Sequence, residues 1–108
     1  MNCRALLLAS LGEKCTAEPA GALAAVRSMF THPEAAKAVR DAMLTEQRQA
    51  TGTMPGQDAD LRTALIGALT LGTVIGRHLL SLDGLRDAPP EQITALLRRP
   101  FHSILHAE

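Results

Sequence analysis

Apolar side chains recur every three or four residues along most of the chain, and clusters of Gly, Pro and Asp interrupt them. That spacing places apolar residues on one face of an α-helix, whereas a half-buried β-strand would need strict alternation. The interruptions divide the sequence into segments of helical length. The pattern therefore predicts an all-α fold of about five helices. We expect one domain over residues 1–108, frayed at residues 1–3 and 106–108.

Local start and stop signals predict the first two helices. We expect the first over residues 4–12, with its end at Gly12. Thr16 can cap the second helix, which then has Glu18 and Pro19 in its first turn. The apolar stripe of this second helix consists of Leu23, Val26 and Phe30.

The third helix has the clearest start signal. In the segment 31–34, the Thr31 hydroxyl can accept a hydrogen bond from the Glu34 N–H while the Glu34 side chain reaches back, which is a capping box. Pro33 is compatible with a first turn, because N–H groups there have no helical partner. Four residues apart, Lys37 and Asp41 can pair on the outer face. The expected buried stripe consists of Ala35, Val39, Ala42 and Met43.

The fourth helix, expected from Asp58 to about Leu82, has more apolar surface than one neighbour can cover. It follows a loop at residues 51–57 and ends where Asp83-Gly84 permits a left-handed turn. Its apolar arc is roughly 220° wide, against about 100° for a helix covered on one side. One apolar stripe holds Gly67, Leu71, Val74 and His78, and the nearly opposite one holds Leu65, Leu69, Gly72, Gly76 and Leu79. Most of the polar residues (Arg62, Thr63, Thr70, Thr73 and Arg77) share the remaining strip.

A helix with two apolar sides needs packing neighbours that cover both of them. The shorter helices of the same chain can cover one side. Leaving Leu71 and Val74 in water would forgo about 1.5–3 kcal/mol each, and would expose a larger apolar patch than monomers usually do. The sequence therefore predicts that a second copy of the chain supplies the other covering.

The fifth helix is expected to begin after Pro89-Pro90, where the fixed φ of proline sets its start. Pro100 lies inside its apolar pattern and removes one helical hydrogen bond, so we expect a kink there. Its apolar face consists of Ile93, Leu96, Leu97, Phe101, Ile104 and Leu105.

Composition argues against nucleic acid and membrane partners for these residues. Eleven Lys and Arg balance eleven Asp and Glu, and the chain has two Phe but no Trp or Tyr. It therefore lacks both the basic field and the stacking surface that nucleic-acid binders use. The apolar start resembles a secretory signal, but Glu13 and Lys14 lie where a small-residue cleavage site should be. The longest uncharged run, Thr63–Gly76, is shorter than the roughly 20 residues that span a bilayer, so we expect no transmembrane helix. Two cysteines without a disulfide framework are typical of free cytosolic thiols, so we expect a cytoplasmic protein.

Catalytic and metal sites have little support in the sequence. Cys3 and Cys15 are not spaced as a metal pair and have no activating base nearby in sequence. His102 and His106 could chelate a metal from one helix face, but no suitable third ligand lies near them in sequence. We expect two solvated histidines, no metal, no cofactor and no enzymatic activity.

The last fifty residues resemble the C-terminal regulatory domain of the TetR family of bacterial transcriptional regulators. The resemblance rests on a long helix with an apolar-small pattern containing Gly72, followed by Arg77 and His78, an exit with spaced leucines, an acidic-Pro-Pro-Glu turn and a last amphipathic helix. The exit leucines are Leu80, Leu82 and Leu85. The earlier stretch SMFTHPEAAKAVRDAM is similar to the family's preceding helices, so the resemblance covers about residues 7–105.

This resemblance implies a homodimer whose last two long helices form a four-helix bundle with their symmetry mates. It also implies a cavity that admits a small apolar effector. By position, the residues that would face the partner are Gly67, Leu71, Val74, His78, Ile93, Leu97 and Phe101. The residues that would line the cavity, or simply fill the core, are Met29, Phe30, Val39, Met43, Leu65, Leu69, Gly72 and Ile75; Met and Phe in a helical stripe are usually packing.

TetR regulators begin with a DNA-reading helix-turn-helix, and none of the segments above has a basic recognition helix. We therefore expect a truncated regulator that binds DNA only together with such a segment upstream of Met1. A stand-alone helical homodimer without a ligand is the alternative. A third hypothesis, a small exported or membrane-surface protein, rests on the apolar start alone.

Overall fold

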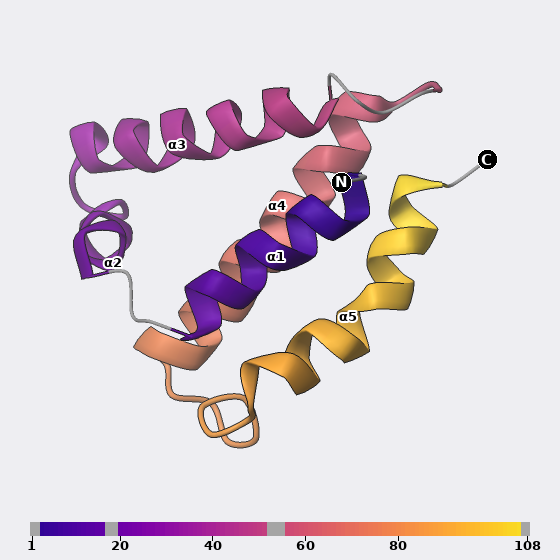
Figure 1. Ribbon diagram of the computed structural model, residues 1–108. Helices are drawn as coiled ribbons and strands as arrows, with labels where there is room; N and C mark the ends of the chain where they lie inside the picture. Colours follow the sequence, from indigo (N-terminus) through magenta and orange to yellow (C-terminus); the bar gives the residue numbers. More distant parts are fainter. Residues whose placement is uncertain (1–2, 17–19, 52–55, 107–108) are drawn as a thin grey trace.

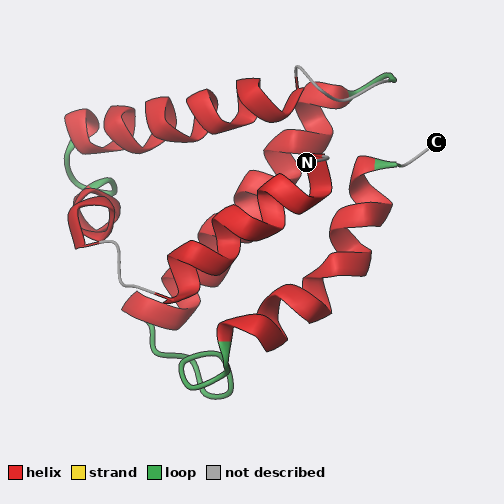
Figure 2. Cartoon of the chain, in the orientation of Figure 1, coloured by secondary structure: helices red, strands yellow, loops and turns green. Residues whose placement is uncertain are grey.

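The computed structural model describes residues 3–16, 20–51 and 56–106. All regular structure in these residues is helical (Figure 2), which confirms the all-α prediction. The elements are α1 (Cys3–Thr16), α2 (Ala20–Ser28), α3 (Pro33–Thr51), α4 (Ala59–Val74), the π-helical turn η1 (Ile75–Leu79) and α5 (Pro90–Leu105).

Helices α4 and α5 form an antiparallel pair, and α1 packs against both of them (Figure 1). The α3 helix packs on α4, and α2 packs on α3. The core lies where α1 meets α4 and α5. Its fully buried members include Leu11, Ile66 and Phe101, and Leu7, Leu8, Ile93 and Leu105 surround them. This arrangement leaves one side of α4 for α2 and α3, which is where the candidate site forms.

Helix α1 is one turn longer than the sequence predicted. It ends at Thr16 instead of Gly12, and the Thr16 hydroxyl donates to the Gly12 carbonyl at 2.7 Å. Thr16 is therefore the last residue of α1 and does not cap α2. The predicted first turn at Glu18 and Pro19 lies outside the described residues. Helix α1 continues because side chains from η1 bond to the carbonyls of its last turn.

The connection between α2 and α3 differs from the predicted capping box. The Thr31 hydroxyl donates to the Ser28 carbonyl at 3.4 Å, and Pro33 is the first residue of α3. The predicted box is offset by one residue from this start, because Pro33 is best suited to the first helical position. The predicted pair of Lys37 and Asp41 is confirmed, at 2.7 Å.

Helix α4 begins as predicted, after Asp58, but leaves the α-helical pattern earlier than Leu82. The Leu80 N–H donates to the Ile75 carbonyl at 2.9 Å, which closes a π-helical turn. The Leu82 N–H donates to the Gly76 carbonyl, also at 2.9 Å. Ser81 takes the left-handed conformation at φ 49°, so the helix has ended before the predicted Asp83-Gly84 stop.

Helix α5 begins at Pro90 after Pro89, as the sequence predicted. Its axis changes direction part-way along (Figure 1), and Pro100 lies inside it. At the chain ends, Cys3 belongs to α1 and the His106 N–H donates to the His102 carbonyl at 2.9 Å. Residues 1–2 and 107–108 lie outside the described part, so the fraying expected at residues 1–3 and 106–108 stays a prediction.

Candidate functional site: two faces of helix α4

Helix α4 carries its polar residues on the inner side. Arg62, Thr63 and Thr70 are all buried. The Arg62 guanidinium donates to the Leu105 carbonyl at 2.6 Å and to the Gln57 carbonyl, so it satisfies acceptors where α5 ends and before α4 begins. The Thr63 hydroxyl donates to the Ala59 carbonyl at 2.9 Å, one turn earlier. The strip that looked polar in sequence is therefore part of the core side of the helix.

The opposite side of α4 exposes leucines. Leu61, Leu65 and Leu69 are 59%, 47% and 39% exposed, respectively. Their spacing of four residues keeps them on one helical face. We call this surface the outer leucine face; its members are Leu61, Ala64, Leu65, Ala68, Leu69 and Gly72, all exposed.

The stripe of α4 that was predicted to face a partner therefore faces this chain's own helices, and leucines of the other stripe are exposed. Gly67, Leu71 and Val74, predicted to face a partner, point instead toward α2 and α3, and Val74 is only 6% exposed. The His78 Nε2–H donates to the Lys14 carbonyl at 2.8 Å. Of the α5 residues predicted to face a partner, Ile93 and Phe101 are buried in the core and Leu97 packs against it. Val74, Ile93 and Phe101 are therefore covered by their own chain, whereas Gly67, Leu71, His78 and Leu97 are only partly buried.

A cavity of about 280 Å³ lies between α4 and the pair α2–α3, with α1 at its edge. Most of its walls are aliphatic. The apolar lining consists of Leu7, Leu23, Ala25, Val26, Ala38, Val39, Ala42, Met43, Ile66, Gly67, Leu71 and Val74, and the polar lining consists of Lys14, Glu46, Gln47, Thr63 and Thr70.

Only part of the predicted cavity set lines this space. Val39 and Met43 belong to the lining. Phe30 is 81% exposed, because α2 ends at Ser28 before reaching it. Met29 and Ile75 are partly buried but do not line the cavity. Leu65, Leu69 and Gly72 belong to the outer leucine face.

A hydrogen-bonded ion pair closes one edge of the cavity. Lys14 Nζ lies 2.9 Å from Glu46 Oε2, and the Ser10 hydroxyl donates to Glu46 Oε1 at 2.6 Å. Burial alone would raise the pKa of Glu46, but the hydrogen bonds from Ser10 and Lys14 outweigh it. The pKa of the carboxyl is therefore below its ordinary value, and Glu46 is ionised at neutral pH. Sequence periodicity could not find this pair, since α1 and α3 are distant along the chain.

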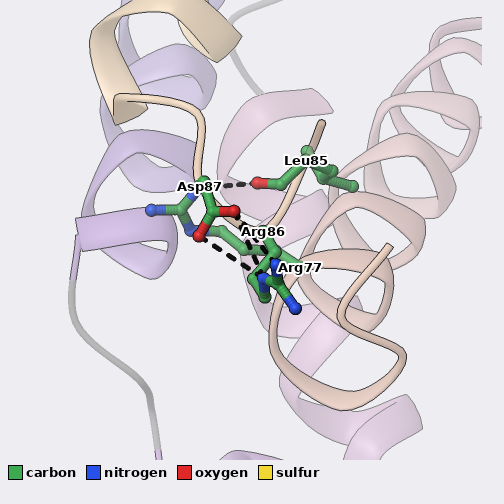
Figure 3. Close-up of polar contacts among 4 residues, drawn as sticks. All are labelled: Arg77, Leu85, Arg86 and Asp87. Carbon is green, nitrogen blue, oxygen red and sulfur yellow. Dashed lines mark hydrogen bonds and ion pairs between the residues drawn. The ribbon is translucent and has the colours of Figure 1, made fainter. Parts of the chain in front are cut away.

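Arg77 connects the end of α4 to two other parts of the chain. Its Nε donates to the Cys15 carbonyl at 3.0 Å, and its Nη1 donates to the Leu85 and Ala88 carbonyls at 2.8 and 2.7 Å. Figure 3 shows the hydrogen bond from Arg77 to the Leu85 carbonyl. It also shows the neighbouring ion pair, in which Arg86 Nη2 lies 3.2 Å from Asp87 Oδ2. Arg77 therefore holds two segments against η1: the last turn of α1, and the loop before α5 that contains Leu85 and Ala88.

The remaining candidates from the sequence are a cysteine, Cys15, and two histidines of α5, His102 and His106. Burial raises the pKa of the Cys15 thiol, although Arg77 partly lowers it, so the thiol is protonated at neutral pH. Arg4 Nη1 lies 3.2 Å from His102 Nδ1, which must accept because Arg has only donors. The His102 and His106 rings lie 4.4 Å apart between centroids. In the described residues, no group of three or more His, Cys, Asp or Glu could hold a metal ion.

A known protein family matches nearly the whole chain. The family described as "Tetracyclin repressor-like, C-terminal domain" matches residues 4–105. This chain belongs to that family. No curated protein and no solved structure matches the chain. The family match confirms the TetR-type resemblance inferred from the apolar-small pattern around Gly72 and the helix after Pro89-Pro90.

One segment of the described residues, Ala59–Leu79, is long and apolar enough to cross a membrane by length and composition alone. The sequence expectation counted only the uncharged run and so missed it. The core helix of a soluble protein passes the same test, and Arg62 and Thr70 on this segment are buried against the rest of the chain.

Proposed function

We propose that this tetracycline repressor-like domain is the ligand-sensing and homodimerisation domain of a cytoplasmic bacterial transcriptional regulator. The cavity of about 280 Å³ carries this proposal. Its lining is aliphatic with a few polar groups, which is the usual composition of small-molecule sites. The effector is a small, largely apolar molecule.

The position of α4 suggests how an effector would act. The cavity lies on one side of α4 and the outer leucine face lies on the other. A ligand that prefers one spacing of α3 and α4 shifts the population toward that spacing, by as much as its affinities for the two states differ. Because α4 also carries the outer leucine face, the shift changes the geometry of the dimer.

The second copy of the chain covers the outer leucine face. Burying the exposed parts of Leu61, Leu65 and Leu69 stabilises the dimer by about 2–4 kcal/mol per protomer, if full burial of a leucine is worth about 1.5–3 kcal/mol. Ala64, Ala68 and Gly72 lie between these leucines and let a partner helix approach closely. This interface replaces the one predicted from the sequence, while the number of subunits stays as predicted.

A cavity-filling substitution tests ligand sensing. A Cβ on Gly67 meets only the Met43 methyl, at 3.4 Å, so Gly67→Leu directs its side chain into the cavity. We expect the variant to stay folded, because Leu is a better helix former than Gly by up to about 1 kcal/mol. We expect its affinity for cyclohexane, a simple apolar probe, to fall at least roughly tenfold because the cavity is filled.

Gly21→Leu is the matched control. A Cβ on Gly21 has nothing within 4 Å, and this glycine lies on α2 away from the cavity lining. Its affinity for cyclohexane should equal that of the natural sequence. If Gly67→Leu and Gly21→Leu bind the probe equally, the cavity is not a ligand site. The alternative, a helical homodimer without a ligand, would then be favoured.

We also propose that these 108 residues do not bind DNA by themselves. Their eleven basic residues are balanced by eleven acidic ones, so they offer no net field to phosphates. Fluorescence anisotropy with a random-sequence duplex at low salt should show no binding. Salt-sensitive binding in that assay would contradict the proposal.

A further inference from the structure

Thr70 differs from the other threonines of α4. The hydroxyls of Thr63 and Thr73 donate to the carbonyls one turn earlier, at 2.9 and 2.8 Å. Among the residues that the structure describes, the Thr70 hydroxyl has no such partner, although Thr70 is only 8% exposed and lines the cavity. The Thr70 hydroxyl oxygen is not among the fully buried side-chain atoms that lack a partner, so it remains open to the cavity and can form a hydrogen bond there. The cavity is the remaining place from which a partner can come.

The charges at the cavity already have partners. In the described part of the chain, Lys14 and Glu46 are the charged residues of the lining, and they pair with each other at 2.9 Å. An anionic ligand would have to displace Glu46 from Lys14, and a cationic ligand would have to displace Lys14 from Glu46. A charged molecule bound deeper, among the aliphatic residues, would have no counter-charge. The electrostatics therefore favour a neutral ligand.

The volume of the cavity limits the size of the ligand. A dry apolar cavity of about 150 Å³ is enough to admit benzene. The space here is about 280 Å³, so it admits a six-carbon ring with a substituent, on the order of ten non-hydrogen atoms in all. In the described lining no aromatic ring is available for stacking, and the walls are formed by Ala, Val, Leu, Ile and Met side chains.

We infer that the effector is a neutral aliphatic molecule with a hydroxyl or carbonyl oxygen, and that this oxygen forms a hydrogen bond with the Thr70 hydroxyl. The inference rests on the proposed ligand-sensing function and adds the chemical class of the ligand and the residue that selects it. Thr70 is a specificity residue: the aliphatic walls bind the hydrocarbon part, and the hydroxyl distinguishes an oxygenated ligand from a plain hydrocarbon.

Four probes with one six-carbon ring separate the possibilities. Cyclohexanol, cyclohexane, cyclohexanecarboxylate and cyclohexylamine differ only in the substituent and its charge. The chain has no Trp or Tyr, so binding is followed by NMR of labelled methyl groups, with Val74 and Leu71 as reporters in the lining. We expect cyclohexanol to bind roughly 3- to 10-fold more tightly than cyclohexane, as one hydrogen bond allows. Both charged probes should bind at least roughly tenfold more weakly than cyclohexanol.

Thr70→Val removes the hydroxyl at nearly constant volume, and Thr73→Val is the matched control, because the Thr73 hydroxyl bonds to the Leu69 carbonyl outside the cavity. Thr70→Val should abolish the preference for cyclohexanol and leave cyclohexane binding unchanged, while Thr73→Val keeps both. Equal binding of the alcohol and the hydrocarbon to the natural sequence, tighter binding of a charged probe, or an unchanged preference in Thr70→Val would overturn the inference but leave the cavity a ligand site. If neither neutral probe binds, the proposed function itself fails. The comparison among probes needs no variant, so it stands even if Thr70→Val does not fold.

Discussion

Arg77 and Arg86 lie nine residues apart but make very different contacts. Comparing the same substitution at the two positions therefore tests the fold. Arg77 donates to three backbone carbonyls, those of Cys15, Leu85 and Ala88, at 2.7–3.0 Å. Among the described residues Arg86 pairs only with its neighbour Asp87, and both side chains are more than half exposed. Replacing each arginine by Met keeps the apolar stem and removes the guanidinium.

The expected magnitudes follow from these contacts. A hydrogen bond to a charged group contributes about 1.5–3 kcal/mol, and Arg77→Met leaves three carbonyls to find other partners. Because Arg77 is only partly buried and such contributions are not additive, we expect the free energy of unfolding to fall by about 3 kcal/mol. For a domain of this size that corresponds to a decrease in Tm of roughly 10–20 °C. Arg86→Met breaks an exposed pair and should cost less than about 1 kcal/mol.

Urea and thermal unfolding followed by far-ultraviolet circular dichroism measure both effects, since the regular structure of the described residues is all helical. The protein concentration must be the same for each variant, because the proposed dimerisation would couple stability to concentration. Equal losses for Arg77→Met and Arg86→Met would refute the claim that Arg77 joins the end of α1 to the loop before α5.

Three further predictions concern α4, the ion pair and the π-helical turn. Leu65→Asp should dissociate the dimer and leave a folded monomer, whereas Val74→Asp should unfold the chain by burying a charge; sedimentation and circular dichroism distinguish these outcomes. The pKa of Glu46 is lowered, so its contribution to stability is present above the ordinary value of 4.5 and is lost as the pH falls through the lower folded value. Glu46→Gln should therefore flatten the acid limb of the pH–stability curve by about 1 kcal/mol or less, and an unchanged limb would count against the pair. A Cβ on Gly76 lies 2.9 Å from Leu85 Cδ2, so Gly76→Val should cost about 1–3 kcal/mol in urea unfolding, against almost nothing for Gly21→Val.

The sequence predicted α5 well because its signals are local. Pro89-Pro90 sets the start of the helix by geometry alone, and Ile93, Phe101 and Leu105 share the apolar face that the periodicity indicated. The start of α4 after Asp58 was predicted for the same reason. Where a signal depends on one or two neighbouring residues, the sequence contains it completely.

The orientation of α4 could not be predicted in this way. A helical wheel identifies two apolar stripes but does not say which one the same chain covers. Arg62 and Arg77 face inward because they donate to carbonyls more than 40 and 60 residues away, at Leu105 and Cys15. Periodicity has no access to such contacts. The same limit hid the Ser10, Lys14 and Glu46 cluster, which joins α1 to α3 at the cavity.

The central claim is that the outer leucine face of α4 is covered by a second copy of the chain. Sedimentation velocity of the natural sequence at micromolar concentration tests it most directly. We expect a single species with twice the mass of one chain. A species with the mass of one chain, unchanged as the concentration is raised, would contradict the claim and leave Leu61, Leu65 and Leu69 exposed in solution.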